Sequence, residues 1–129
     1  MIDTATLERW AQKTGFDTDA GAQGAVRLTP RGGAHADLPP FYMQHSQNWV
    51  LLSILPVFQP DVLLPEDINR RLLSVNRDMR IAKFALDLDD EVVLCAELPT
   101  ESLDYSELAD AIERLVKYHQ HYREYLLNP

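Results

Sequence analysis

The sequence has little cysteine, few basic residues and no long apolar stretch. Its one cysteine, Cys95, excludes an internal disulfide and a zinc site made of several cysteines, and it is consistent with a reducing cytoplasm. The longest apolar run covers residues 49–58 and contains Ser53 and Pro56, so it is too short to cross a bilayer. The N-terminal residues lack the basic segment and apolar stretch of a secretory signal peptide. We therefore expect a cytoplasmic protein without a membrane partner.

Basic residues are outnumbered, because the 129-residue chain has 12 Lys and Arg against 20 Asp and Glu, a formal net charge of -8. Such a chain is repelled by nucleic-acid phosphates and anionic membranes unless it carries a strong basic patch. Five basic residues do gather in one stretch, namely Arg70, Arg71, Arg77, Arg80 and Lys83. They fit a solvated surface or, as an alternative, a patch for an acidic partner. No aromatic residues lie between them to stack on bases, so we predict no nucleic-acid partner.

Hydrophobic residues make up 46% of the sequence, enough for a single domain over residues 1–129 with its own core. Pro65 is expected to open the second helix, and Asp104 with Glu107 to cap the last one. The expected elements are a helix at 4–14, strands near 24–29, 41–45 and 49–57, a helix from 65 to about 76–79, a hairpin of 80–87 and 91–98, and a helix from 104 to the end. This order, α-β-β-β-α-β-β-α, predicts an α+β fold with an antiparallel sheet flanked by helices.

The strand at 49–57 is apolar on both of its faces. On one side lie Val50, Leu52 and Ile54, and on the other lie Trp49, Leu51 and Leu55. A strand with one face in water should alternate apolar with polar residues, so both faces need cover. Helices of the same chain can cover one face. The other needs a partner, a ligand or the Gly- and Pro-rich loop at 17–40, and Ser53 suggests that the Trp49 side faces outward.

The sequence shows no constellation typical of catalysis or metal binding. His119 and His121 are two apart on a helix and point away from each other, so they cannot share a metal. Asp87, Asp89 and Glu91 begin like a calcium loop, but apolar residues occupy its glycine and glutamate positions, which favours an acidic hairpin turn. No nucleophile elbow, P-loop or dinucleotide fingerprint is present. We therefore predict no enzyme activity, no metal and no cofactor.

The last two thirds of the chain contain four motifs that follow one another in a definite order. They are Leu64-Pro-Glu, Leu72-Leu73-x-Val75-Asn76, the hairpin Phe84–Asp90 with Val92–Pro99, and Leu103-Asp104 before a long closing helix. This order resembles the YbjN-like family and the class I chaperones of type III secretion, which share the order α-β-β-β-α-β-β-α. The resemblance covers about residues 41–126 and a first helix bearing Trp10. Residues 21–40 depart from it, since a Gly- and Pro-rich stretch replaces a compact first strand and turn.

The resemblance implies a non-enzymatic, chaperone-like or regulatory homodimer that binds a segment of another protein. The alternative is a small-ligand-binding protein or an enzyme that uses the apolar sheet face as a pocket. The expected partner-binding residues are Leu7, Trp10, Phe41, Met43, Trp49 and Leu51. The resemblance places the dimer interface at Ile68, Leu72, Leu73, Asn76 and Arg77. The sequence adds that Leu73 lies beside the apolar stripe of its helix and widens it.

Overall fold

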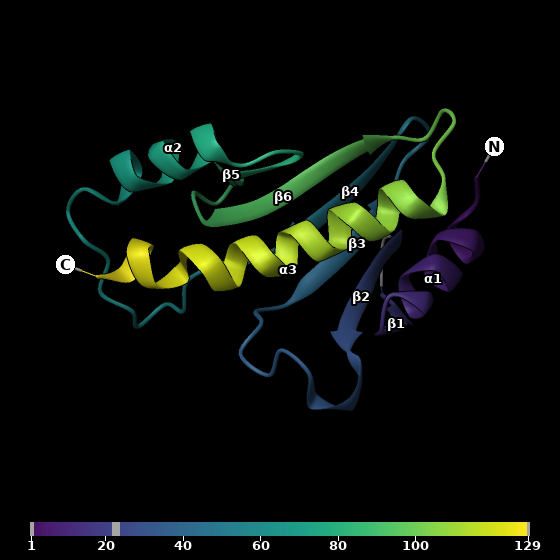
Figure 1. Cartoon of the computed structure of the whole chain (residues 1–129), viewed down its shortest axis with the longest axis horizontal. Helices are drawn as coiled ribbons and strands as arrows, with labels where there is room; N and C mark the ends of the chain where they lie inside the picture. The colour runs from purple at the N-terminus through teal and green to yellow at the C-terminus, as the bar shows by residue number, and fades with distance from the viewer. Residues whose placement is uncertain (1, 22–23, 129) are drawn as a thin grey trace.

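The computed structural model describes residues 2–21 and 24–128 and consists of one antiparallel sheet with helices on one face (Figure 1). Its elements are α1 (Thr4–Lys13), β1 (Phe16–Ala20), β2 (Ala25–Pro30), a short 3-10 turn (Arg31–Gly33), β3 (Phe41–His45), β4 (Trp49–Ile54), α2 (Ile68–Asp78), β5 (Ala82–Leu86), β6 (Val92–Pro99) and α3 (Tyr105–Leu127). The six strands lie in the order β1-β2-β3-β4-β6-β5, so β1 and β5 form the two edges. The α+β class is confirmed.

The predicted element order was one strand short, because β1 occupies residues that were expected to be a loop. Gly15, with a φ of 101°, lets the chain turn from α1 straight into β1. β1 pairs with β2 from Phe16 opposite Pro30 to Ala20 opposite Val26. Asp is depleted in strands, so Asp17 and Asp19 concealed the alternation of this segment. The observed order is α-β-β-β-β-α-β-β-α.

The second helix begins later than predicted. Pro65 lies in the preceding turn, where its carbonyl oxygen accepts a hydrogen bond of 3.1 Å from the Ile68 N–H. Asp67 is the N-cap residue, and its carboxylate pairs with Arg71 one turn on at 2.9 Å. The helix ends at Asp78, within the predicted range.

The start of α3 agrees with the predicted capping box. The Asp104 carboxylate accepts a hydrogen bond of 2.9 Å from the Glu107 N–H, and the Glu107 carboxylate accepts one of 3.2 Å from the Asp104 N–H. The bond from the Glu107 backbone, aided by the Ser106 hydroxyl, lowers the pKa of Asp104. These bonds fix the direction in which α3 leaves the sheet.

The core lies between α3 and the inward face of the sheet. Helix α3 runs the length of the molecule, with α1 beside its N-terminal part and α2 beside its C-terminal part (Figure 1). Phe41 is fully buried, and its ring meets that of Phe16 edge to face at 5.7 Å. The buried residues of the long helix are Leu108, Ala111, Ile112, Leu115, Val116, His119 and Leu126. Among the described residues, no helix is long and apolar enough to cross a membrane.

Neighbouring residues of β3 give a test of which sheet face is buried. Phe41→Ala should lower the free energy of unfolding by about 3–5 kcal/mol, because it opens a cavity in the core. Tyr42→Ala changes the next residue on the opposite, partly exposed face and should cost about 1 kcal/mol. Urea denaturation of both variants measures the two changes in the free energy of unfolding. A larger loss for Tyr42→Ala would contradict the assignment of Phe41 to the buried face of β3.

Candidate functional site

The outward face of the sheet is the first candidate surface. Val50, Leu52 and Ile54 of β4 are fully buried beneath the helices, whereas Trp49 is 48% exposed and Leu51 is half-buried. In the described part of the chain, every helix lies on the inward side (Figure 1). The predicted outward orientation of Trp49 is therefore confirmed. We call the surface formed by Trp49, Leu51, Ser53, Leu55, Val93 and Cys95 the outer face.

A shallow hollow of about 400 Å³ lies in the outer face where β4, β6 and β5 run side by side. Val93 and Cys95 line it and are nevertheless buried, although no helix of the described chain covers this side. Lys83 and Glu97 approach to 3.8 Å at its border. Burial raises the pKa of the Cys95 thiol, which agrees with the expected inert role of this residue.

The loop after β2 does not cover the outer face, which was one of the alternatives left open by the sequence. It lies on the helix side of the sheet, because His35 and Asp37 contact α3. The His35 Nδ1 is 2.7 Å from the Gln120 Nε2, and an Arg123 Nη1 donates to the Asp37 carboxylate at 2.6 Å. Ala22 and Gln23, within the stretch expected to be a loop, lie outside the described residues.

Three of the predicted partner-binding residues belong to the core instead. Leu7, Phe41 and Met43 are buried beneath or within the helix layer, since each faces inward from α1 or β3. They cannot contact a partner in this conformation, and we leave them out of the candidate surface. Trp10 is half-buried, and its ring meets that of Tyr105 at 6.4 Å.

The second candidate surface is a groove of about 230 Å³ between α2 and the edge strand β5, which we call the α2–β5 groove. Its lining is Asn69, Leu72, Leu73, Asn76, Phe84, Ala85 and Leu86. Leu72 is buried in its floor, whereas Leu73 is 70% exposed. The Asn76 amide holds α2 on β5, because its oxygen accepts from the Phe84 N–H at 2.7 Å and its nitrogen donates to the Phe84 carbonyl at 3.0 Å.

The residues predicted for the dimer interface therefore divide into two groups. Leu73 and Arg77 are exposed on α2, whereas Leu72 is buried and Ile68 packs half-buried against the core. The Asn76 side chain is hydrogen-bonded to the backbone of Phe84 in β5. Leu86 was not among the residues predicted for either site, although it is 60% exposed where β5 ends. Ala85 and Leu86 line both hollows, so the groove and the outer face meet at this edge strand.

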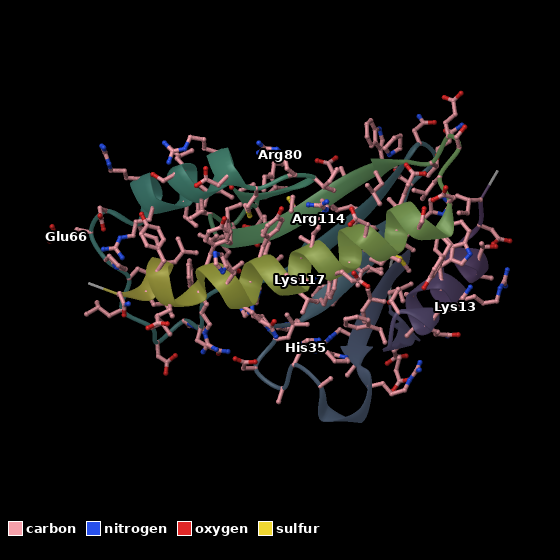
Figure 2. All side chains as sticks on the ribbon, in the orientation of Figure 1. Lys13, His35, Glu66, Arg80, Arg114 and Lys117 are labelled. Atoms are coloured by element: carbon pink, nitrogen blue, oxygen red, sulfur yellow. The ribbon has the colours of Figure 1, made fainter. Side chains whose placement is uncertain are left out.

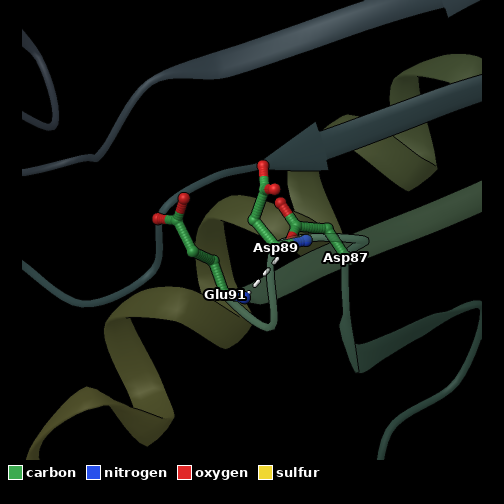
Figure 3. Close-up of side chains that lie close together, drawn as sticks. All are labelled: Asp87, Asp89 and Glu91. Carbon is green, nitrogen blue, oxygen red and sulfur yellow. Dashed lines mark hydrogen bonds between the residues drawn. The ribbon is translucent and has the colours of Figure 1, made fainter.

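The acidic turn between β5 and β6 brings three carboxylates together (Figure 3). Ligand atoms of Asp87, Asp89 and Glu91 all lie within 4.8 Å of one another. One oxygen of Asp87 already accepts hydrogen bonds from the backbone N–H groups of Asp89 and Glu91, both at 2.9 Å. The Asp87 carboxylate thus shapes the turn, as expected for an acidic hairpin.

The arrangement of sheet and helices is shared with several solved proteins. The chain is 19% identical to YbjN from E. coli, with a TM-score of 0.70 over 99% of this chain and 97% of that one. It is 24% identical to a chain of the heterodimeric ExoU–SpcU complex from the type III secretion system of Pseudomonas aeruginosa, with a TM-score of 0.68 over 95% and 98%. A chain of the HopA1–SchA chaperone–effector complex matches at 14% identity and a TM-score of 0.61 over 96% and 99%. These likenesses define the fold class.

The sequence then identifies the family within that class. The family model matches residues 6–123, so the chain belongs to the Tir chaperone protein (CesT) family. This is a family of chaperone proteins rather than of enzymes, which confirms the prediction of a non-enzymatic protein. No curated protein matches the sequence significantly.

We expect no calcium site at the acidic turn. Because Asp87 is committed to backbone N–H groups and the remaining calcium-loop positions are apolar, millimolar calcium should move the thermal midpoint by less than about one degree. Differential scanning fluorimetry with calcium and with a chelator measures this, and Glu91→Gln is the control. An upward shift of several degrees that Glu91→Gln removes would show that the turn does bind the ion.

Proposed function

We propose that this protein is a non-enzymatic, chaperone-like homodimer that binds a segment of another protein chain along its outer face. The observation that carries the proposal is the outward side of β4, where Trp49 is 48% exposed, Leu51 is half-buried and no helix of the described chain lies above them. Apolar side chains gathered on an open surface are typical of protein-binding sites. Membership of a chaperone family and the chaperone–effector complex of a relative with this fold agree with it.

The shape of the outer face favours an extended or helical segment over a small molecule. The hollow is open and shallow, and it continues past Leu86 into the α2–β5 groove. Small ligands prefer enclosed cavities that bury most of their surface. A protein segment can instead lie along a sheet face or pair with a sheet edge. The small-ligand interpretation is therefore the weaker one, and a chaperone and a regulatory partner would use this surface in the same way.

The proposed dimer contact is the α2–β5 groove. Leu73 stands out of α2 between Arg70 and Arg77, so an exposed leucine has no apolar neighbour on its own helix face. Arg70 and Arg77 flank Leu73 on α2, and β5 ends in the acidic turn at 87–91. A second copy related by a two-fold axis could bring the acidic turn of one copy towards the arginines of the other, which is the self-complementarity that such contacts need.

Leu73→Asp tests the dimer. The variant loses the apolar contact of Leu73 and would bury a carboxylate in the interface, a desolvation cost that Arg70 and Arg77 offset only in part, so it should give a folded monomer. Light scattering at micromolar concentration should report twice 14.7 kDa for the wild type and 14.7 kDa for the variant.

Leu63→Asp is the matched control, because Leu63 is 93% exposed and does not line the groove. It should leave the dimer intact. A monomeric wild type refutes the dimer outright, and a dimeric Leu73→Asp places the interface elsewhere.

Trp49→Ala tests the outer face. It should keep the circular dichroism spectrum and melting temperature of the wild type, because Trp49 is half in solvent, but it should lose proteins that the wild type captures from a native lysate of its source cells. Tyr125→Ala is the matched control, since Tyr125 is equally exposed, at 47%, but lies on α3.

The two variants distinguish the loss of a binding surface from the loss of the folded structure. If Trp49→Ala unfolds, Trp49 belongs to the core and the surface is misassigned. If both variants retain the same captured proteins, the binding site lies away from the outer face, and the basic residues around Arg70 and Arg77 are the next surface to vary.

A further inference from the structure

Residues 31–40, which we call the strap, connect β2 to β3 and lie against the C-terminal half of α3. His35 is labelled below this helix in Figure 2, and its Nδ1 is 2.7 Å from the Gln120 Nε2. One turn further along α3, an Arg123 Nη1 donates to the Asp37 carboxylate at 2.6 Å. Leu38 packs against the core beside these contacts. Two polar contacts and one apolar contact therefore hold the strap on the helix.

A buried imidazole lies beneath the strap. His119 precedes Arg123 by one turn of α3 and is 4% exposed, and its Nδ1 has no hydrogen-bond partner among the described residues. The ring borders a cavity of about 50 Å³ that Asp37 and Pro39 close from the strap side. Buried polar atoms without a protein partner are uncommon, so the ring is a candidate for a role beyond packing.

The charged groups around the ring favour its neutral form while the strap is closed. Burial lowers the pKa of His119, the nearby Arg123 guanidinium lowers it further, and only the Asp37 carboxylate acts in the opposite direction. The other elements that line the cavity contribute uncharged side chains, namely Val57, Phe58, Gln59 and Val62 before α2 and Phe84 of β5. The strap has two further titratable groups: His35 contacts Gln120, and Arg31 pairs with Asp17 at 3.1 Å.

We propose that His119 and the strap form a proton-operated latch, in which a neutral ring keeps the strap on α3 and a charged ring releases it. A charged ring would be held out of water beneath the strap, and lifting the strap hydrates it, which must outweigh the loss of its attraction to Asp37. The backbone is prepared for such a movement, since Gly32 and Gly33 have φ values of 70° and 76° at the base of the strap. His35 adopts a left-handed φ of 52°, a strain that opening would relieve. The latch does not depend on the partner binding proposed above.

The direction of the pH dependence follows from linkage. The closed state holds His119 with a pKa below the ordinary value of 6.5, so the open state binds the proton more readily. Closure is fully favoured above about pH 6.5 and weakens as the pH falls below it, by up to about tenfold per pH unit for one proton.

Hydrogen–deuterium exchange of the strap amides tests the latch in the full-length protein. Between about pH 7.5 and about pH 5.5, and after correction for intrinsic exchange, protection of the strap should fall by at most about tenfold, whereas that of β4 should not change. His119→Phe keeps an aromatic ring without a titrating group and should abolish this dependence. His35→Ala should loosen the strap at both pH values but keep the ratio between them. If His119→Phe retains the dependence, if His35→Ala removes it, or if the wild type shows none, the proposal is wrong.

A second measurement uses only the wild type and so does not depend on the folding of a variant. A proton NMR titration of the His119 ring should give a midpoint below the ordinary value, and the Leu38 amide signal should change with the same midpoint. If the two midpoints differ, or if the ring titrates while the Leu38 signal stays fixed, the ring does not operate the strap.

Discussion

The burial of one sheet face beneath α3 is the interaction on which the rest of this structure depends. Leu108, Ile112 and Leu115 of α3 are fully buried against the inward residues of the central strands. Each such side chain contributes about 1.5–3 kcal/mol of transfer free energy, so this seam is the main source of stability. Both smaller helices contact α3, which places all three helices on the same side. A sheet covered on one side only leaves its central apolar strand with a second face for a partner.

The two candidate surfaces are physically connected at β5. Ala85 and Leu86 line both the α2–β5 groove and the hollow of the outer face. A copy of the protein seated in the groove would therefore form one wall of the surface offered to a client segment. The Asn76 amide ties α2 to the same strand, so the position of α2 sets the depth of the groove. Binding of a client and assembly of two copies would then be mutually dependent through a few side chains.

Much of the fold was predictable because its signals are local. The apolar run of β4, the capping box at Asp104 and the apolar stripe of α3 each follow from residues a few positions apart. The missed strand β1 carries two Asp residues, and its pairing with β2 outweighs their poor strand propensity.

For the candidate site, the polar Ser53 in an otherwise apolar strand was enough to orient Trp49 outward. The position of Leu73 beside the apolar stripe of its helix was enough to place it on the surface. Which face of a strand meets the helices depends on residues far away in the sequence. Phe41 and Met43 were therefore predicted to bind a partner, although they face the core. The contact of His35 with Gln120 joins residues 85 positions apart, and no sequence pattern predicts it.

The two edges of the sheet are protected in different ways. At one edge, β1 exposes Asp17 and Asp19, and charges on an edge strand discourage pairing with another chain. At the other edge, the Asn76 amide of α2 occupies both the N–H and the carbonyl of Phe84, in the middle of β5. Another chain would have to displace this amide before it could add a strand there. The sheet is therefore guarded by charge at one border and by a helix at the other, which opposes its growth into a fibre.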